Sequence, residues 1–97
     1  MLFPEVPLPR TLAQRHLVHA ASRRPMVEME RVLHRFLVAE LIGLDDFDCE
    51  RMIALLDNAD ADLLDWMAGV KPLPEDLEVD ALSRLLIHAR DPGVSRA

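Results

Sequence analysis

The sequence predicts an all-α fold, a compact five-helix antiparallel bundle that forms a single domain. Three observations support this prediction: a length of 97 residues, apolar residues that recur at helical spacing, and proline or glycine between the periodic segments. The hydrophobic fraction of 51% is enough for one core, and no run approaches the roughly 18 apolar residues of a membrane-spanning helix. We expect a proline-rich N-terminal tail at 1–10, the helical domain at 11–91 and a C-terminal tail at 92–97.

The first two predicted helices are separated by a short basic segment. Thr11 is a suitable N-cap for a helix over 12–21. The residues at spacings of three and four along this helix are Leu12, Arg15, His16, His19 and Ala20. Pro25 suits the first position of a second, longer helix, and Gly43 supplies its end. The apolar stripe of the second helix consists of Met26, Met29, Leu33, Phe36, Leu37 and Leu41.

Three shorter helices are expected in the remainder of the chain. Asp45 or Asp46 can cap a third helix that runs to about Asp57, and Asp60 can cap a fourth that ends at Gly69. A fifth helix should run from Glu75 to about Arg90, after a linker with two prolines. The side chains expected to face the interior from these helices are Phe47, Met52, Ile53, Leu56, Leu63, Leu64, Trp66, Met67, Leu77, Ala81, Leu82, Leu85 and Leu86. Connections this short favour a bundle.

Charge is distributed unevenly along the chain. Residues 1–36 hold six Arg and three Glu, a net charge of +3, whereas residues 37–97 hold five basic and fourteen acidic groups, a net charge of −9. Because the acidic part dominates and tyrosine is absent, we do not expect a nucleic-acid binder. The N-terminal residues do not resemble a secretory signal, and the single cysteine, Cys49, suits a reducing compartment, so we expect a cytoplasmic protein.

The sequence contains no convincing catalytic or metal site. Asn58, Asp60 and Asp62 alternate as in the opening of a calcium loop, but glycine and glutamate are missing at the later positions that such a loop requires. His16 and His19 share a helix face, with no third ligand identifiable. Cys49 lies between two acidic residues and is expected to be a small core residue. We therefore expect a binding protein without catalytic activity.

The segment before the second helix departs from what folding alone favours. Arg23 and Arg24 place cations at a helix N-terminus, where each opposes the helix dipole by roughly 0.3 to 1 kcal/mol. Glu28, Arg31 and Arg35 then form a charged stripe opposite the apolar one. On the residues alone, a solvated surface is the simpler interpretation of this stripe.

Two blocks of the sequence resemble the SdhE (YgfY) family of FAD assembly factors. Residues 23–30, R-R-P-M-V-E-M-E, are similar to the family's R-R-G-M-x-E-L-D, which carries its R-G-x-x-E signature. Residues 55–66, L-L-D-N-A-D-A-D-L-L-D-W, with Gly69, Lys71 and Pro72, are similar to its L-L-x-x-x-D-x-D-L-x-x-W-x-x-G pattern. Pro25 stands where the family has glycine, and Leu17 and Ala20 replace an upstream basic and an aromatic residue.

The resemblance implies a five-helix protein that binds the apo flavoprotein subunit of succinate dehydrogenase or fumarate reductase. It implies that binding promotes covalent attachment of FAD to a histidine of that partner, with no cofactor held stably by this chain. The expected partner-binding residues are Arg23, Arg24, Pro25, Met26 and Glu28. We expect a monomer without membrane insertion. The alternative is a regulatory or antitoxin-like module that docks through the acidic residues between Asp45 and Asp65.

Overall fold

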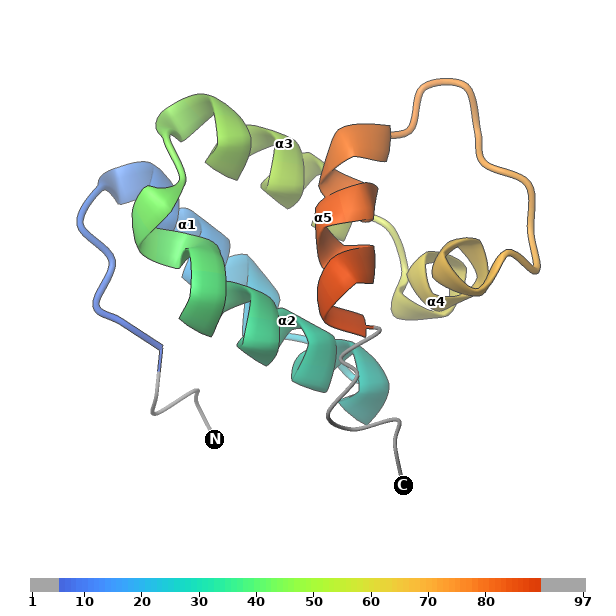
Figure 1. The fold of residues 1–97 in the computed structure, drawn as a ribbon, viewed down its shortest axis with the longest axis horizontal. Helices are drawn as coiled ribbons and strands as arrows, with labels where there is room; N and C mark the ends of the chain where they lie inside the picture. The colour runs from blue at the N-terminus through green and yellow to red at the C-terminus, as the bar shows by residue number, and fades with distance from the viewer. Residues whose placement is uncertain (1–5, 90–97) are drawn as a thin grey trace.

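A computed structural model describes residues 6–89, and within this range the chain forms five α-helices and one short 3-10 turn (Figure 1). Residues 6–10 are extended. The elements are α1 (Leu12–Ala21), α2 (Val27–Glu40), the 3-10 turn η1 (Leu41–Gly43), α3 (Asp46–Leu56), α4 (Asp60–Ala68) and α5 (Val79–Ala89). The all-α prediction is confirmed. The predicted tail at 92–97, and Arg90 as the end of the fifth helix, lie outside the described residues.

Local capping explains several of the helix boundaries. The Thr11 hydroxyl accepts a hydrogen bond from the Gln14 amide at 3.0 Å, and the Asp45 carboxylate accepts one from the Asp48 amide at 2.8 Å. Gly69 ends α4 with a φ of 75°, a left-handed conformation that favours glycine. These three boundaries were predictable because each depends on residues close together in sequence.

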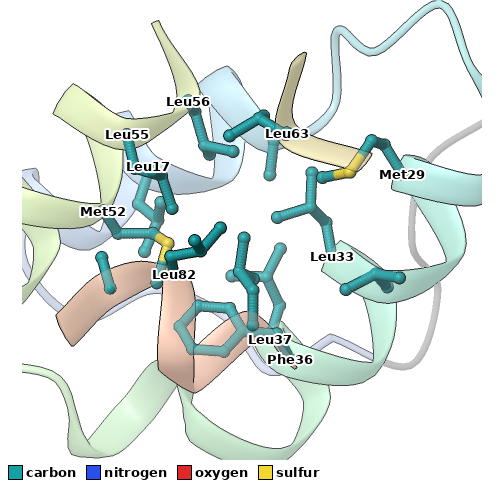
Figure 2. Packing of buried hydrophobic residues seen from close by; sticks show 14 of the residues in the cluster. Leu17, Met29, Leu33, Phe36, Leu37, Met52, Leu55, Leu56, Leu63 and Leu82 are labelled. Carbon is teal, nitrogen blue, oxygen red and sulfur yellow. The ribbon is translucent and has the colours of Figure 1, made fainter. Parts of the chain in front are cut away.

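One hydrophobic core joins all five helices. Leucines and methionines from every helix point toward a common interior, with Phe36 beside them (Figure 2). α2 runs opposite to α1, and α5 packs against both α2 and α3 (Figure 1). The fully buried large side chains are Leu17, Met29, Leu33, Phe36, Leu37, Leu41, Met52, Leu55, Leu63 and Leu85. None of the helices described here is both long and apolar enough to cross a membrane.

A buried glutamine attaches the extended N-terminal segment to the helices. The Gln14 side-chain oxygen accepts a hydrogen bond from the Arg10 amide at 2.7 Å, and its nitrogen donates to the Leu44 carbonyl at 3.0 Å. Gln14 is only 2% exposed, so these bonds satisfy a polar group that would be costly to bury alone. Residues 6–10 are thereby held beside α1.

The residues of α1 that share a helical spacing with Leu12 lie on its exposed face. Gln14, Leu17 and Ala21 are buried, whereas Leu12, Arg15, His16 and His19 are exposed. Both stripes have helical spacing, so periodicity could not decide between them.

The burial of Phe47 and the starts of two helices were predicted wrongly. Phe47 is 60% exposed, and its ring lies 5.0 Å from the Arg51 guanidinium carbon. α2 begins at Val27 with Met26 as N-cap, so Pro25 precedes the helix. α5 begins at Val79, four residues after the predicted Glu75, because the segment before it forms turns.

Candidate partner-binding surface

The two sequence blocks that carry the family resemblance meet in space at Arg24 and Asp60. Arg24 Nη1 lies 3.1 Å from Asp60 Oδ1, within ion-pair distance, and donates a hydrogen bond to the Leu56 carbonyl at 3.1 Å. The Met26 amide donates to Asp60 Oδ2 at 3.2 Å. The segment before α2 is therefore attached to the end of α3 and the start of α4 by charge and by two hydrogen bonds.

Asp60 is buried in this ion pair, and Arg24 is largely buried. The side chains of Arg24 and Asp60 are 15% and 2% exposed. Asp60 Oδ1 has no hydrogen-bond partner among the described residues although Arg24 Nη1 is close, so the contact through this oxygen is an ionic attraction without hydrogen-bond geometry. Because solvent screens such a buried pair poorly, removing either charge should be far more costly than at the surface.

The position of Asp60 corrects its predicted role and explains Arg24. Ala59 is the N-cap of α4 and Asp60 is the first helical residue, so Asp60 does not cap its own helix. Its carboxylate instead accepts the amide of Met26, the N-cap of α2, and lies at the N-terminal ends of two helices, where the dipoles favour an anion. The same carboxylate offsets the unfavourable placement of the Arg24 cation.

The other predicted contact residues remain accessible. Arg23, Pro25 and Glu28 are exposed, and Met26 is half-buried. We call these four residues the signature patch. Val27 lies between these residues in sequence and was not among the predicted contacts. Its apolar side chain is 57% exposed. The structure thus separates the five predicted residues into four at the surface and one, Arg24, in an intramolecular ion pair.

The predicted charged stripe on α2 is only partly a surface feature. Arg31 is exposed, whereas the Arg35 Nε donates a hydrogen bond to the His88 carbonyl at 2.9 Å. Arg35 therefore contributes to the packing of α5 on α2. The His88 Nε2 lies 2.6 Å from Glu40 Oε2 and strengthens the same contact.

The rest of the second block has structural roles. Lys71 forms an ion pair with Asp62, and its ammonium lies 5.6 Å from the centre of the Trp66 ring. The hydrogen bond to Asp62 raises the pKa of Lys71 above its ordinary value. These contacts join α4 to the linker that follows it.

The acidic residues between Asp45 and Asp65 do not form one free anionic face. Asp60 is buried against Arg24, Asp62 pairs with Lys71, and the Asp48 carboxylate lies 3.8 Å from Arg84. Asp46 and Glu50 are exposed. Several acids that an acidic docking module would present to a partner therefore pair with basic residues of the same chain.

The other candidates for chemistry were the two histidines of α1 and Cys49. His16 and His19 are exposed on α1, and within residues 6–89 no group of three His, Cys, Asp or Glu could hold a metal ion. Cys49 is fully buried, and its pKa is raised by burial first and then by Asp46 and Asp48. The prediction that Cys49 is a core residue is confirmed.

Comparison with known proteins places this surface in a family context. A family model described as Sdh5, flavinator of succinate dehydrogenase, matches residues 15–90 of the chain. The match covers both sequence blocks and all five residues of the predicted contact set. No curated protein and no solved structure matches the chain.

Replacing Asp60 by asparagine should destabilise the protein strongly. The asparagine would still offer an oxygen to the Met26 amide but would leave the buried Arg24 cation without a counter-charge, at a cost of about 3 kcal/mol. Urea unfolding measures the change. The matched control is Asp62→Asn, which breaks a half-exposed pair and should have a much smaller effect on stability. Equal effects of the two variants would contradict the assignment.

Cys49 should react slowly with thiol reagents in the folded protein. The thiolate is the reactive form, and burial together with the nearby carboxylates disfavours it, so labelling at about pH 8 should be at least roughly a hundredfold slower than in urea. The rate is measured with an aromatic disulfide reagent, from the absorbance of the aromatic thiol that it releases. Fast, complete labelling of the folded chain would show that this cysteine is accessible.

Proposed function

The chain belongs to the family of flavinators of succinate dehydrogenase, and from this premise we propose that it binds the apo flavoprotein subunit of succinate dehydrogenase or fumarate reductase. Binding promotes covalent attachment of FAD to that subunit. FAD belongs to the partner, and this chain holds no cofactor stably. The observation that carries the proposal is the exposed signature patch at the start of α2, which lies within the matched residues.

In this proposal the residues of the motif divide into contact and positioning roles. Glu28 and Arg23 present opposite charges to the partner, with Pro25 and Met26 between them. Arg24 acts through Asp60: it fixes the backbone that carries the patch and leaves little of its own side chain for the partner. Pro25 suits this role, because its fixed φ lowers the conformational freedom of the segment before binding.

The proposed mechanism is a shift of population and includes no bond chemistry on this chain. An assembly factor that binds the flavinylation-competent conformation of the flavoprotein more tightly than its other conformations raises the fraction of competent molecules. A tenfold difference in affinity corresponds to about 1.4 kcal/mol, which a few charged contacts can supply. The covalent bond then forms within the partner.

Replacing Glu28 by glutamine should weaken this complex. Loss of one charge-assisted contact should raise the Kd for the apo flavoprotein subunit about tenfold and lower covalent flavin fluorescence on a denaturing gel after co-expression. Glu50→Gln is the matched control, since Glu50 is an exposed glutamate on α3. Absence of a complex with the unaltered chain, or of any gain in covalent flavin, would overturn the proposed function.

The positioning role of Arg24 predicts that Asp60→Asn also weakens binding, although Asp60 is buried. The measurement is made at low temperature, where circular dichroism shows the variant to be folded. We expect the Kd to rise about fivefold or more, because the patch is no longer held in one conformation. A folded Asp60→Asn variant that binds as tightly as the unaltered chain would show that the ion pair serves stability alone.

A further inference from the structure

The exposed stripe of α1 and the extended N-terminal segment enclose a groove of about 600 Å³. The lining residues that matter most here are Pro7, Leu8, Leu12, Arg15, His16 and His19. Leu8 and Leu12 are 85% and 63% exposed, so the apolar part of the groove is open to solvent. The hydrogen bond from the Arg10 amide to the Gln14 side chain holds the N-terminal segment against α1.

The charge of the groove is opposite to that of the protein. Its ionisable lining residues are Arg15, His16 and His19, and none of the described lining residues is acidic, in a chain whose net charge is −6. An apolar floor with the Arg15 guanidinium at its edge attracts a segment that combines apolar side chains with a carboxylate. Pro7 and Pro9 lack amide hydrogens, so pairing of a partner strand along this segment is disfavoured and side-chain contacts must dominate.

The groove is continuous with the signature patch. Ser22 lines the groove and its hydroxyl donates to the His19 carbonyl at 2.9 Å. Arg23 Nη1 of the patch lies 3.3 Å from His19 Nε2 of the groove. A partner bound at the patch is therefore adjacent to the end of the groove.

We propose that this groove is a second docking site for the same flavoprotein subunit and takes an apolar segment of it that carries aspartate or glutamate. The inference rests on the proposed function, and it extends the interface from the start of α2 along the outer face of α1. Leu12 and Leu8 bind the apolar side chains, and Arg15 binds a carboxylate. The family model matches the chain from residue 15 onward. The wall of the groove formed by residues 6–9 therefore lies outside the matched region.

Two single substitutions test the groove. Leu12→Ser removes an exposed apolar contact and Arg15→Glu reverses a charge, and neither side chain is part of the core. Each should raise the Kd for the apo flavoprotein subunit about tenfold with unchanged circular dichroism. Val70→Ser is the matched control, because Val70 is 71% exposed and lies far from the groove in sequence. Its Kd should be unchanged.

The outcomes separate this inference from the proposed function. If Glu28→Gln weakens binding while Leu12→Ser and Arg15→Glu bind about as tightly as the unaltered chain, the groove is overturned and the function stands. If the unaltered chain does not bind the subunit, both are overturned. A photocrosslinker in place of Leu12 should attach to a flavoprotein peptide that contains apolar and acidic residues. Attachment to a second copy of this chain, in a dimer that Leu12→Ser dissociates, would overturn the proposed occupant.

Discussion

The ion pair between Arg24 and Asp60 is the interaction on which the proposed surface depends. Burying two charges is expensive, and their attraction offsets the cost only when the geometry is held by other contacts. Here those contacts are the Arg24 bond to the Leu56 carbonyl and the Met26 amide bond to Asp60. We infer that the charged pair serves specificity, because its hydrogen bonds to the backbone at Leu56 and Met26 hold one conformation of the segment before α2.

The acidic and the basic parts of the sequence have different roles in the structure. Several acids of residues 37–89 form pairs within the chain. Glu78, just before α5, pairs with Arg51 of α3, and Glu40 at the end of α2 pairs with Arg84 of α5. The basic groups of α1 and the following segment are instead largely exposed, with Arg24 as the exception. The cationic surface is thus small and local, which suits recognition of one site on a protein more than an extended polyanion.

Features determined by neighbouring residues could be predicted from the sequence, and features determined by tertiary contacts could not. The start of α1 follows from the Thr11 cap, and the end of α4 follows from Gly69. The buried face of α1 could not be predicted, because Leu12 and His16 recur at helical spacing just as Gln14 and Leu17 do. The Arg24–Asp60 pair was missed for a different reason: each residue has an adequate local explanation, as a surface cation or as a cap, and only the packing of α4 against the start of α2 brings them together. The motif marked Arg24 as a candidate contact residue, but it did not indicate that its side chain is paired with Asp60 inside the fold.

In the proposed function, rigidity of the contact surface is what allows binding to favour one conformation of the partner. The entropy lost by ordering flexible groups on binding subtracts from the affinity, so a segment already held by buried contacts keeps more of its contact energy for the partner. The patch gains this advantage from the Arg24–Asp60 pair, and the wall of the groove gains it from Gln14. The contact of Arg23 with His19 joins the two proposed surfaces, so the proposed interface would select a partner with a complementary charge pair and an apolar acidic segment at a fixed separation. In this proposal, a flavoprotein conformation that lacks either feature loses part of the interface. The resulting difference in binding free energy between conformations is what lets an assembly factor favour one of them.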